Sequence, residues 1–340
     1  MNRTEKFYEM IFKRKSFHLF RDNKTKKYYS DNYKIMEDEI ADIYQVFQTF
    51  RPLVEDIRVE IRIVENELTT CKRGQEYCIL LYSEKKNNYL QNIGFLGEQL
   101  DLYLASKTIG ALWFGVGKTE ELSYHGLEFV TMIAICKVPE NSFRKDMFKS
   151  KRKPVEEIWR GEKYSDIANI VRFAPSSCNT QPWIVEEQGS ELLVYRYKKP
   201  DKRGIMAVHK VTYQNLMDIG IFILFLSLCL EHKGIKHSLK IYDDNSENEE
   251  EFPSEASQLL PSTSEWSNVS LKDTNREILN HRTEDVYLYD YSGRAARLLT
   301  LQEYANEAYP NIDTWNSQWN PPIYMLENQA YSTDNSSTYY

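Results

Sequence analysis

The chain has 340 residues, enough for one large domain or two, and 41% of them are apolar, so it can bury a core. Its net charge is −7 at pH 7, and no basic block is long enough to suggest a nucleic-acid groove. The first ten residues lack the apolar segment of a signal peptide, and the longest apolar run, 219–230, is too short to span a bilayer. The five cysteines show neither metal-ligand spacing nor the even number of a disulfide framework. We therefore expect a cytoplasmic protein with no nucleic-acid or membrane partner.

The first distinctive segment is a basic turn at residues 13–18, Lys-Arg-Lys-Ser-Phe-His. Arg offers paired donors and Ser a hydroxyl, which suits a phosphate, although such clusters are also common at solvated helix ends. Hydrophobic periodicity then predicts helices over 35–47 and 92–106, and strands over 57–65, 77–82 and 127–137.

Two more segments of the first half have both a structural and a functional interpretation. Residues 108–117 contain three glycines after the predicted helix. This is typical of a helix end that leads into a strand, and it also permits close backbone approach to a flat ligand. Residues 149–154, KSKRKP, are either a charged linker or additional cations for a phosphate.

A stiff polar loop dominates the second half. Residues 174–183, APSSCNTQPW, lie between a predicted helix at 164–173 and a predicted strand at 183–187. Pro175 and Pro182 each fix φ and remove a backbone donor, so the loop can present hydroxyls and amides in a preset arrangement. An ordinary surface turn with a buried Trp is the alternative. A second apolar helix is predicted at 216–230.

Taken together, these segments resemble the FMN-dependent nitroreductase family. The basic turn resembles its RRSxRxF segment, with His18 where an arginine is usual. Residues 108–115 resemble GLGTCWxG, with Thr108 in place of the first glycine, and residues 174–183 resemble APSxxNxQPW. Arg152 matches a cation that follows the last strand in many members.

The resemblance implies three groups of contacts with FMN. The phosphate would be held by Arg14, Lys15, Ser16, His18 and Arg152. The backbone around Trp113, Phe114 and Gly115 would stabilise negative charge on the reduced ring. The ring and ribityl chain would lie against Pro175, Ser176, Ser177, Asn179 and Gln181.

The chain also repeats itself weakly. Residues 93–104 resemble 219–230 at an offset of 126, and 40–43 resemble 167–170 at an offset of 127. The functional segments do not repeat, since the basic turn occurs only in the first half and the proline loop only in the second. This layout resembles the two-module branch of the family over residues 5–242, in which the two modules would share one site.

We therefore expect an α+β, nitroreductase-like three-layer fold with a mixed, mainly antiparallel sheet. Its half-modules would be 1–150, on the FMN phosphate side, and 151–242, which carries the flavin loop. The helices at 92–106 and 216–230 would pair at the centre. Residues 243–340 form an acidic linker and a C-terminal extension without a predicted role, with a helix pattern at 294–308. The layout is compatible with a monomeric pseudo-dimer.

The function that this resemblance implies is an FMN-dependent NAD(P)H oxidoreductase, which passes two electrons to a nitroaromatic or quinone-like acceptor in a ping-pong cycle. Because the cofactor supplies the chemistry, no side chain is predicted as acid or base. The His18 and Thr108 departures keep two alternatives open: a non-catalytic FMN-binding or storage protein, and a degenerate structural member of the fold. The scattered histidines favour neither a metal site nor a hydrolase. The sequence specifies neither the acceptor nor the choice between NADH and NADPH.

Overall fold

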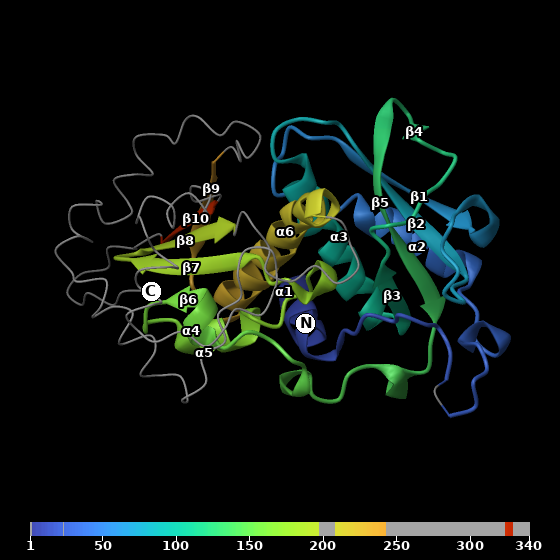
Figure 1. The fold of residues 1–340 in the computed structure, drawn as a ribbon, viewed down its shortest axis with the longest axis horizontal. Helices are drawn as coiled ribbons and strands as arrows, with labels where there is room; N and C mark the ends of the chain where they lie inside the picture. Colours follow the sequence, from blue (N-terminus) through green and yellow to red (C-terminus); the bar gives the residue numbers. More distant parts are fainter. Residues whose placement is uncertain (1, 23, 197–207, 243–323, 329–340) are drawn as a thin grey trace, which may run out of the picture.

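A computed structural model describes residues 2–22, 24–196, 208–242 and 324–328, and for 208–209 and 324–328 it describes the backbone (Figure 1). The first half contains helices and strands in the order α1 (Arg3–Lys13), α2 (Glu37–Phe47), β1 (Val59–Glu65), β2 (Tyr77–Ser83), α3 (Tyr89–Ser106), β3 (Ile109–Trp113), β4 (Ser123–Tyr124) and β5 (Leu127–Lys137). The second half contains α4 (Val155–Ile158), β6 (Trp159–Arg160), α5 (Ser165–Val171), β7 (Trp183–Gln188), β8 (Glu191–Arg196), α6 (Val208–His232), β9 (His237–Ile241) and β10 (Tyr324–Asn328). Five 3-10 turns connect them: η1 (Tyr29–Asp31), η2 (Asn66–Leu68), η3 (Glu140–Ser142), η4 (Met147–Lys149) and η5 (Ser177–Asn179).

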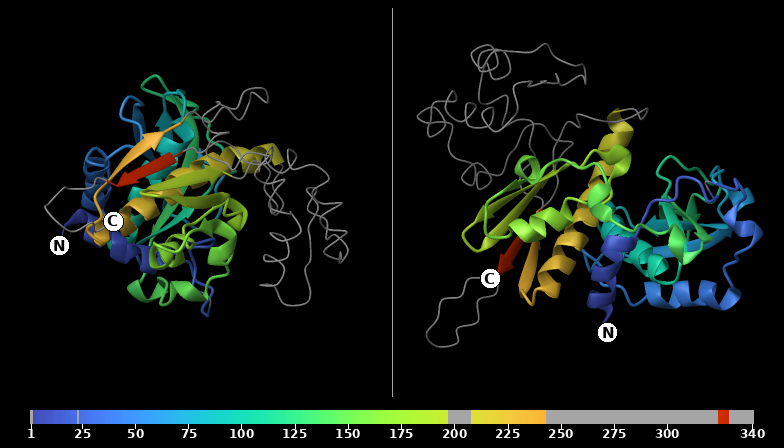
Figure 2. Two further views of the ribbon diagram at one scale, coloured as in Figure 1. Left: turned by 90° about the vertical axis from the view of Figure 1, so that its left-hand side faces the viewer. Right: turned by 90° about the horizontal axis from the view of Figure 1, so that it is seen from below.

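The strands form two sheets at opposite ends of the molecule, with α1, α3 and α6 between them (Figures 1 and 2). The first sheet has the order β1-β2-β5-β3, with β4 paired to β5, and all its pairs are antiparallel. The second has the order β6-β7-β8-β10-β9, in which only β6 and β7 are parallel. The expected α+β architecture with mainly antiparallel strands is confirmed, but the strands form two separate sheets rather than the one mixed sheet that was expected.

Strand β10 comes from the C-terminal extension, which the sequence analysis left without a role. It pairs with β8 on one side and β9 on the other. As a result the four central strands follow the same plan in both sheets. In each, an antiparallel hairpin leads through a long helix to a third strand, and the fourth strand inserts between the hairpin and that third strand.

Helices α3 and α6 pack against each other in the core, as predicted from their apolar patterns. Two glycines permit this contact. A Cβ on Gly94 would lie 1.9 Å from the carbonyl oxygen of Met217, and a Cβ on Gly220 would lie 1.9 Å from that of Gln91. Both members of the second contact are offset by 126 residues from those of the first, so the helices meet through reciprocal positions.

The predicted elements of the first half coincide with α2, β1, β2, α3 and β5 to within a few residues. Helix α6 is longer than predicted, because it begins at Val208 rather than near residue 216. By length and composition alone α6 could cross a membrane, yet 89% of its most apolar window is buried inside the fold, as is typical of a core helix. The helix pattern at 294–308 lies outside the described residues.

Candidate functional site

The basic turn begins where α1 ends, and its one arginine, Arg14, is buried. Arg14 is 2% exposed; its guanidinium donates to Asp101 Oδ2 at 2.8 Å and lies 3.4 Å from Glu98 Oε1. Burial opposes the charge, but the two carboxylates raise the pKa of Arg14 above its usual range. The same guanidinium donates to Ser16 Oγ at 3.2 Å. The charge of Arg14 is therefore paired with Asp101 and Glu98, and its guanidinium orients Ser16.

Three other cations lie close to Arg14 without such compensation. Burial, followed by the neighbouring charge of Arg14, lowers the pKa of Arg144 to about 10, although Asp101 opposes this. Burial and then the charges of Arg144, Arg14 and Arg172 lower the pKa of Arg152 to about 10. Burial and then Arg144 also lower the pKa of Lys15. Within the described part of the chain, neither arginine nor Lys15 forms an ion pair.

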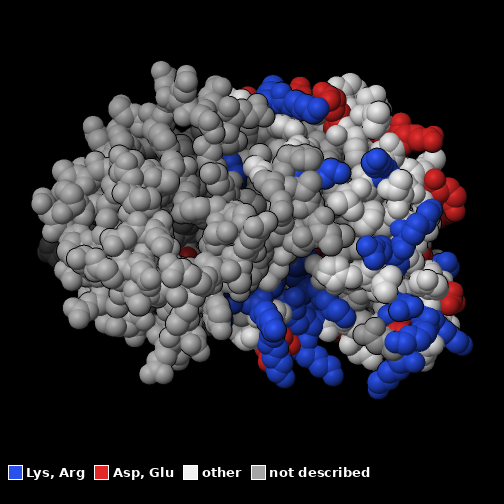
Figure 3. Space-filling view, viewed as in Figure 1, with Lys and Arg blue, Asp and Glu red and all other residues white. Residues whose placement is uncertain are grey.

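The basic turn and the η3 segment meet in space, since Lys15 Nζ donates to the Ser142 carbonyl and the Arg144 N–H donates to the Lys13 carbonyl. The charge of Arg144 acts on both Lys15 and Arg152. Figure 3 shows Lys and Arg side chains gathered at the lower centre of the drawn face, over the region that α1 and the η3–η4 segment occupy in Figure 1. Partly buried cations that repel one another and have no carboxylate partner would be stabilised by an anion. We call Lys15, Arg144 and Arg152 the cation cluster.

The proline loop is attached to the cation cluster. The Arg152 guanidinium donates to Asn179 Oδ1 at 2.7 Å, and the backbone N–H of Lys153 donates to Gln181 Oε1 at 2.8 Å. The loop is also strained, since Cys178, Asn179 and Gln181 have φ values of 52°, 57° and 48°. This left-handed conformation costs about 1 kcal/mol or more per residue, and such strain tends to occur at functional sites.

A polar stripe on α6 holds the other side of the loop. Asp218 accepts the backbone N–H of Ser177 at 3.0 Å, and Asn215 Oδ1 accepts the Thr180 hydroxyl at 2.9 Å. One helical turn before Asp218, Gln214 Nε2 donates to the carbonyl of Gly115 at 2.9 Å. Three buried polar side chains of one helix face thus bind the loop of the second half and the glycine segment of the first.

Asp218 precedes the apolar run 219–230, where it could be mistaken for a helix cap, but α6 begins ten residues before it, at Val208. The spacing of Gln214, Asn215 and Asp218 was an available signal, since positions i, i+1 and i+4 share a helix face. Arg144 was also missed. It follows β5 in the segment that leads to the predicted basic cluster, so its location in the chain was the only signal.

Contacts from Ser16 reach Glu98, and a charge interaction between Glu98 and Asp218 leads on to Ser177 of the other half. The indole N–H of Trp113 donates to Glu98 Oε2 at 3.2 Å, and Glu98 contacts Arg14, which contacts Ser16. Burial raises the pKa of Glu98 well above its usual range, against the opposing charge of Arg14; the charges of Asp101 and Asp218 add to the increase. Burial likewise raises the pKa of Asp218, whose carboxylate binds Ser177. The basic turn and the proline loop therefore flank one buried polar core.

The other expected residues are placed as follows. Lys15 Nζ donates to the Ser142 carbonyl at 3.1 Å, and Ser176 Oγ accepts the N–H of Gln181 at 2.9 Å. The guanidinium of Arg73 lies 5.6 Å above the Phe114 ring. Pro175 is half-buried at the start of the loop. His18 is exposed and, among the described residues, has neither a hydrogen bond nor an ion pair.

The sequence matches the model of the family named "Putative TM nitroreductase" over residues 6–229, about two thirds of its length. The chain belongs to this family. Among solved structures, it is similar to a "putative nitroreductase" from Thermotoga maritima, with 18% identity and a TM-score of 0.46 over 69% of this chain and 89% of that one. No curated protein matches the chain.

Membership in the nitroreductase family indicates an oxidoreductase. The matched range includes both the basic turn and the proline loop, together with α6 up to residue 229. It ends before β9 and does not include β10, so the family pattern covers the cation cluster and the polar stripe but not the strands that complete the second sheet.

Proposed function

We propose that this protein is an FMN-dependent NAD(P)H oxidoreductase that reduces nitroaromatic or quinone-like acceptors by two electrons in a ping-pong cycle. One observation carries the proposal. The basic turn and the proline loop are about 160 residues apart in sequence, yet they flank the same cation cluster. The hydrogen bond from Arg152 to Asn179 joins this cluster to the proline loop. A dianionic phosphate would compensate these cations, so the residues present fit FMN.

Each part of the site has a role in this proposal. The cation cluster would bind the phosphate, with Arg14 holding Ser16 in position. The strained loop would present Asn179 and Gln181 to the flavin, and the carbonyl of Gly115, fixed by Gln214, would set the backbone beside the ring. Bound FMN supplies hydride and electron transfer, while the protein sets its position and electrostatic surroundings.

Two related half-modules would account for this arrangement. Asn92 Oδ1 accepts the N–H of Leu53 at 2.8 Å, and Asp218, at an offset of 126, accepts that of Ser177. Each long helix thus holds the loop of its own half through an equivalent position. Together with the equivalent strand orders and the reciprocal glycine contacts, this supports a duplicated architecture.

The same symmetry would create a second flavin site, and the cavity at that place is small. A cavity of about 170 Å³ lies beside Thr49 and Arg51, in the first-half segment equivalent to the proline loop. It is smaller than the roughly 300–1,000 Å³ of ordinary ligand sites. There, Leu224 and Ser227 occupy the positions equivalent to Glu98 and Asp101. We therefore propose a monomeric pseudo-dimer with one flavin site, acting in the cytoplasm on small molecules alone.

The test is an absorbance spectrum of the purified full-length protein after incubation with FMN, before and after anaerobic addition of NADPH or NADH. Flavin bands that bleach on addition would support the oxidoreductase. Bands that persist would indicate an FMN carrier without turnover. If the desalted protein retains no flavin, the cation cluster does not serve FMN and the proposal fails.

A further inference from the structure

A cleft between α1, the C-terminal end of α3 and the η3 segment is not used by the proposed function. Its volume is about 580 Å³, within the range of small-molecule sites. Of the residues proposed to contact the flavin, none lines this cleft, and of the cation cluster only Arg144 does. The cleft is therefore a separate location from the proposed flavin contacts.

The cleft carries an excess of positive charge, although the chain as a whole has a net charge of −7. Four cations line it against the two carboxylates of Glu9 and Glu140; the cations are Lys6, Lys13, Arg144 and Lys145. Throughout the described ranges, none of these six side chains forms an ion pair. The excess of two positive charges matches a phosphate monoester, which is close to a dianion at neutral pH.

Arg144 is the cation of the cleft that an anion would stabilise most. Burial, followed by the charge of Arg14, lowers its pKa to about 10. Asp101 opposes this effect, but its carboxylate already accepts a hydrogen bond from Arg14 at 2.8 Å. A phosphate in the cleft would favour the charged form of Arg144 without displacing an existing ion-pair partner.

Two phenylalanine rings give the cleft an aromatic wall. Phe12 and Phe143 are half-buried, and a neighbouring ring orients each of them. Phe12 packs edge-on against Tyr8, with ring centroids 5.3 Å apart. Phe143 packs edge-on against Phe17, with ring centroids 5.4 Å apart. An aromatic ligand would therefore meet apolar surface that is already oriented for ring packing.

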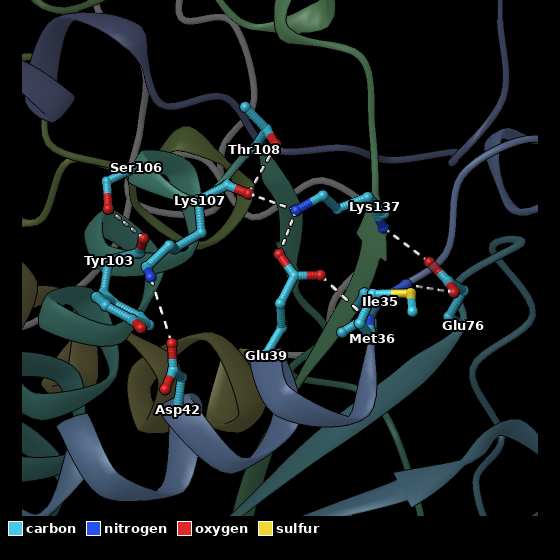
Figure 4. A network of polar contacts seen from close by, with 10 residues as sticks. All are labelled: Ile35, Met36, Glu39, Asp42, Glu76, Tyr103, Ser106, Lys107, Thr108 and Lys137. Atoms are coloured by element: carbon cyan, nitrogen blue, oxygen red, sulfur yellow. Dashed lines mark hydrogen bonds and ion pairs between the residues drawn. The ribbon is translucent and has the colours of Figure 1, made fainter.

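The end of α3 provides hydroxyl groups to the same cleft (Figure 4). The Ser106 hydroxyl donates to the Tyr103 carbonyl at 2.7 Å, and the Thr108 hydroxyl donates to the Lys107 carbonyl at 2.6 Å. Each hydroxyl proton is thus committed to the backbone, while each oxygen can still accept a hydrogen bond. These two oxygens suit a ligand that carries hydroxyl donors, such as a sugar.

This wall of the cleft is preformed. Lys137 Nζ of β5 donates to the Lys107 carbonyl at 2.8 Å and also pairs with Glu39 of α2. Lys107 Nζ pairs with Asp42 of α2 at 3.4 Å (Figure 4). Because these contacts join three elements, the wall would not have to be ordered on binding, which lowers the entropic cost.

We propose that this cleft binds a nucleoside monophosphate. Its phosphate would pair with Arg144 and the lysines, its base would pack against the two phenylalanine rings, and its sugar hydroxyls would donate to Ser106 and Thr108. The inference goes beyond the proposed function, because this ligand is neither the flavin nor its electron donor or acceptor.

The test is calorimetric titration of the full-length protein, saturated with FMN, with AMP, adenosine or inorganic phosphate. AMP should bind at least about tenfold more tightly than either of the others, because only AMP contacts both the cations and the rings. Omitting FMN should leave the affinity for AMP unchanged. An affinity for AMP no higher than that for phosphate, or AMP binding that FMN abolishes, would overturn the inference.

Variants locate the bound AMP. Lys13→Ala and Lys145→Ala remove exposed cations of the cleft and should each weaken AMP several-fold, whereas Phe143→Leu should weaken AMP and leave phosphate unchanged. Lys24→Ala, an exposed lysine in the turn at 22–27, is the matched control, and Arg152→Ala is the control at the flavin site; neither should affect AMP. Unchanged affinity for AMP in both cleft-lysine variants would refute the proposed location. If the protein does not bind FMN, the proposed function fails, while the titration with AMP still decides this inference.

Discussion

The crossing of α3 and α6 gives a quantitative prediction for Gly94→Ala. In an isolated helix this change would stabilise by about 1 kcal/mol. Here the new Cβ would lie 1.9 Å from the Met217 carbonyl oxygen, about 1.5 Å short of an ordinary contact of 3.4 Å. The oxygen belongs to the backbone of a buried helix and cannot rotate away. Since a gap of 0.5–1 Å already forfeits a quarter to a half of a dispersion contact, separating the helices is costly. We expect a net loss of about 3 kcal/mol or more.

The measurement is urea unfolding of the full-length protein, with the slope of the transition monitored so that a change in midpoint reports stability. Gly220→Ala should cost about as much, because its Cβ meets the Gln91 carbonyl at the same 1.9 Å. The double variant should cost less than the sum, since helices already separated accommodate the second methyl group. Gly97→Ala is the matched control in the same helix: its Cβ meets the edge of the Trp113 ring, a side chain that can move. If Gly94→Ala is no more destabilising than Gly97→Ala, the reasoning is wrong.

Three further predictions follow from the site and the second sheet. Asp218→Asn keeps an acceptor for Ser177 and removes a buried charge. The folded-state pKa of Asp218 is raised above the ordinary 3.8, so the wild-type protein loses stability as pH rises from 3.8 towards that folded-state pKa. The gain in stability of the variant, measured by urea unfolding, should therefore be larger at pH 8 than at pH 5. An equal gain at both pH values would contradict this. Arg152→Ala should weaken flavin binding about tenfold by calorimetric titration, with partial recovery in Arg152→Lys; unchanged affinity would remove Arg152 from the phosphate site. A chain ending at residue 242 should lose amide protection in β8 and β9, whereas one ending at 328 should retain it, because β10 pairs with both strands; equal protection in the two chains would refute this.

Much of the local structure could be predicted from the sequence because it depends on local periodicity. Strand β5 has the predicted bounds, and α3 differs from its prediction only at the start. The pairing of α3 with α6 was also predictable, since both carry long apolar surfaces that must be buried. The resemblance of the basic turn and the proline loop to nitroreductases is consistent with the family model, while FMN and the duplication stay proposals.

The departure at Thr108 has a structural feature that the sequence alone did not reveal. Thr108, where the family pattern has glycine, has a φ of 57°, so the turn after α3 retains the conformation that favours glycine. The loop residues Cys178 and Gln181 are strained in the same way. A pattern of residue types does not reveal the backbone angle that surrounding contacts impose.

The sequence by itself determined which segments become helices and strands, where the stiff proline loop lies, and which family the chain resembles, because propensity, periodicity and turn chemistry act over a few residues. Only the tertiary structure decided which cations are paired with carboxylates and which remain available to bind an anion. Arg14 is neutralised by Asp101 and Glu98 from a helix almost ninety residues away, while Arg144 and Arg152 are partly buried without a carboxylate. Likewise, only the fold inserts β10 between β8 and β9. Desolvation and Coulomb interactions depend on neighbours in space, and no local pattern in the chain encodes them.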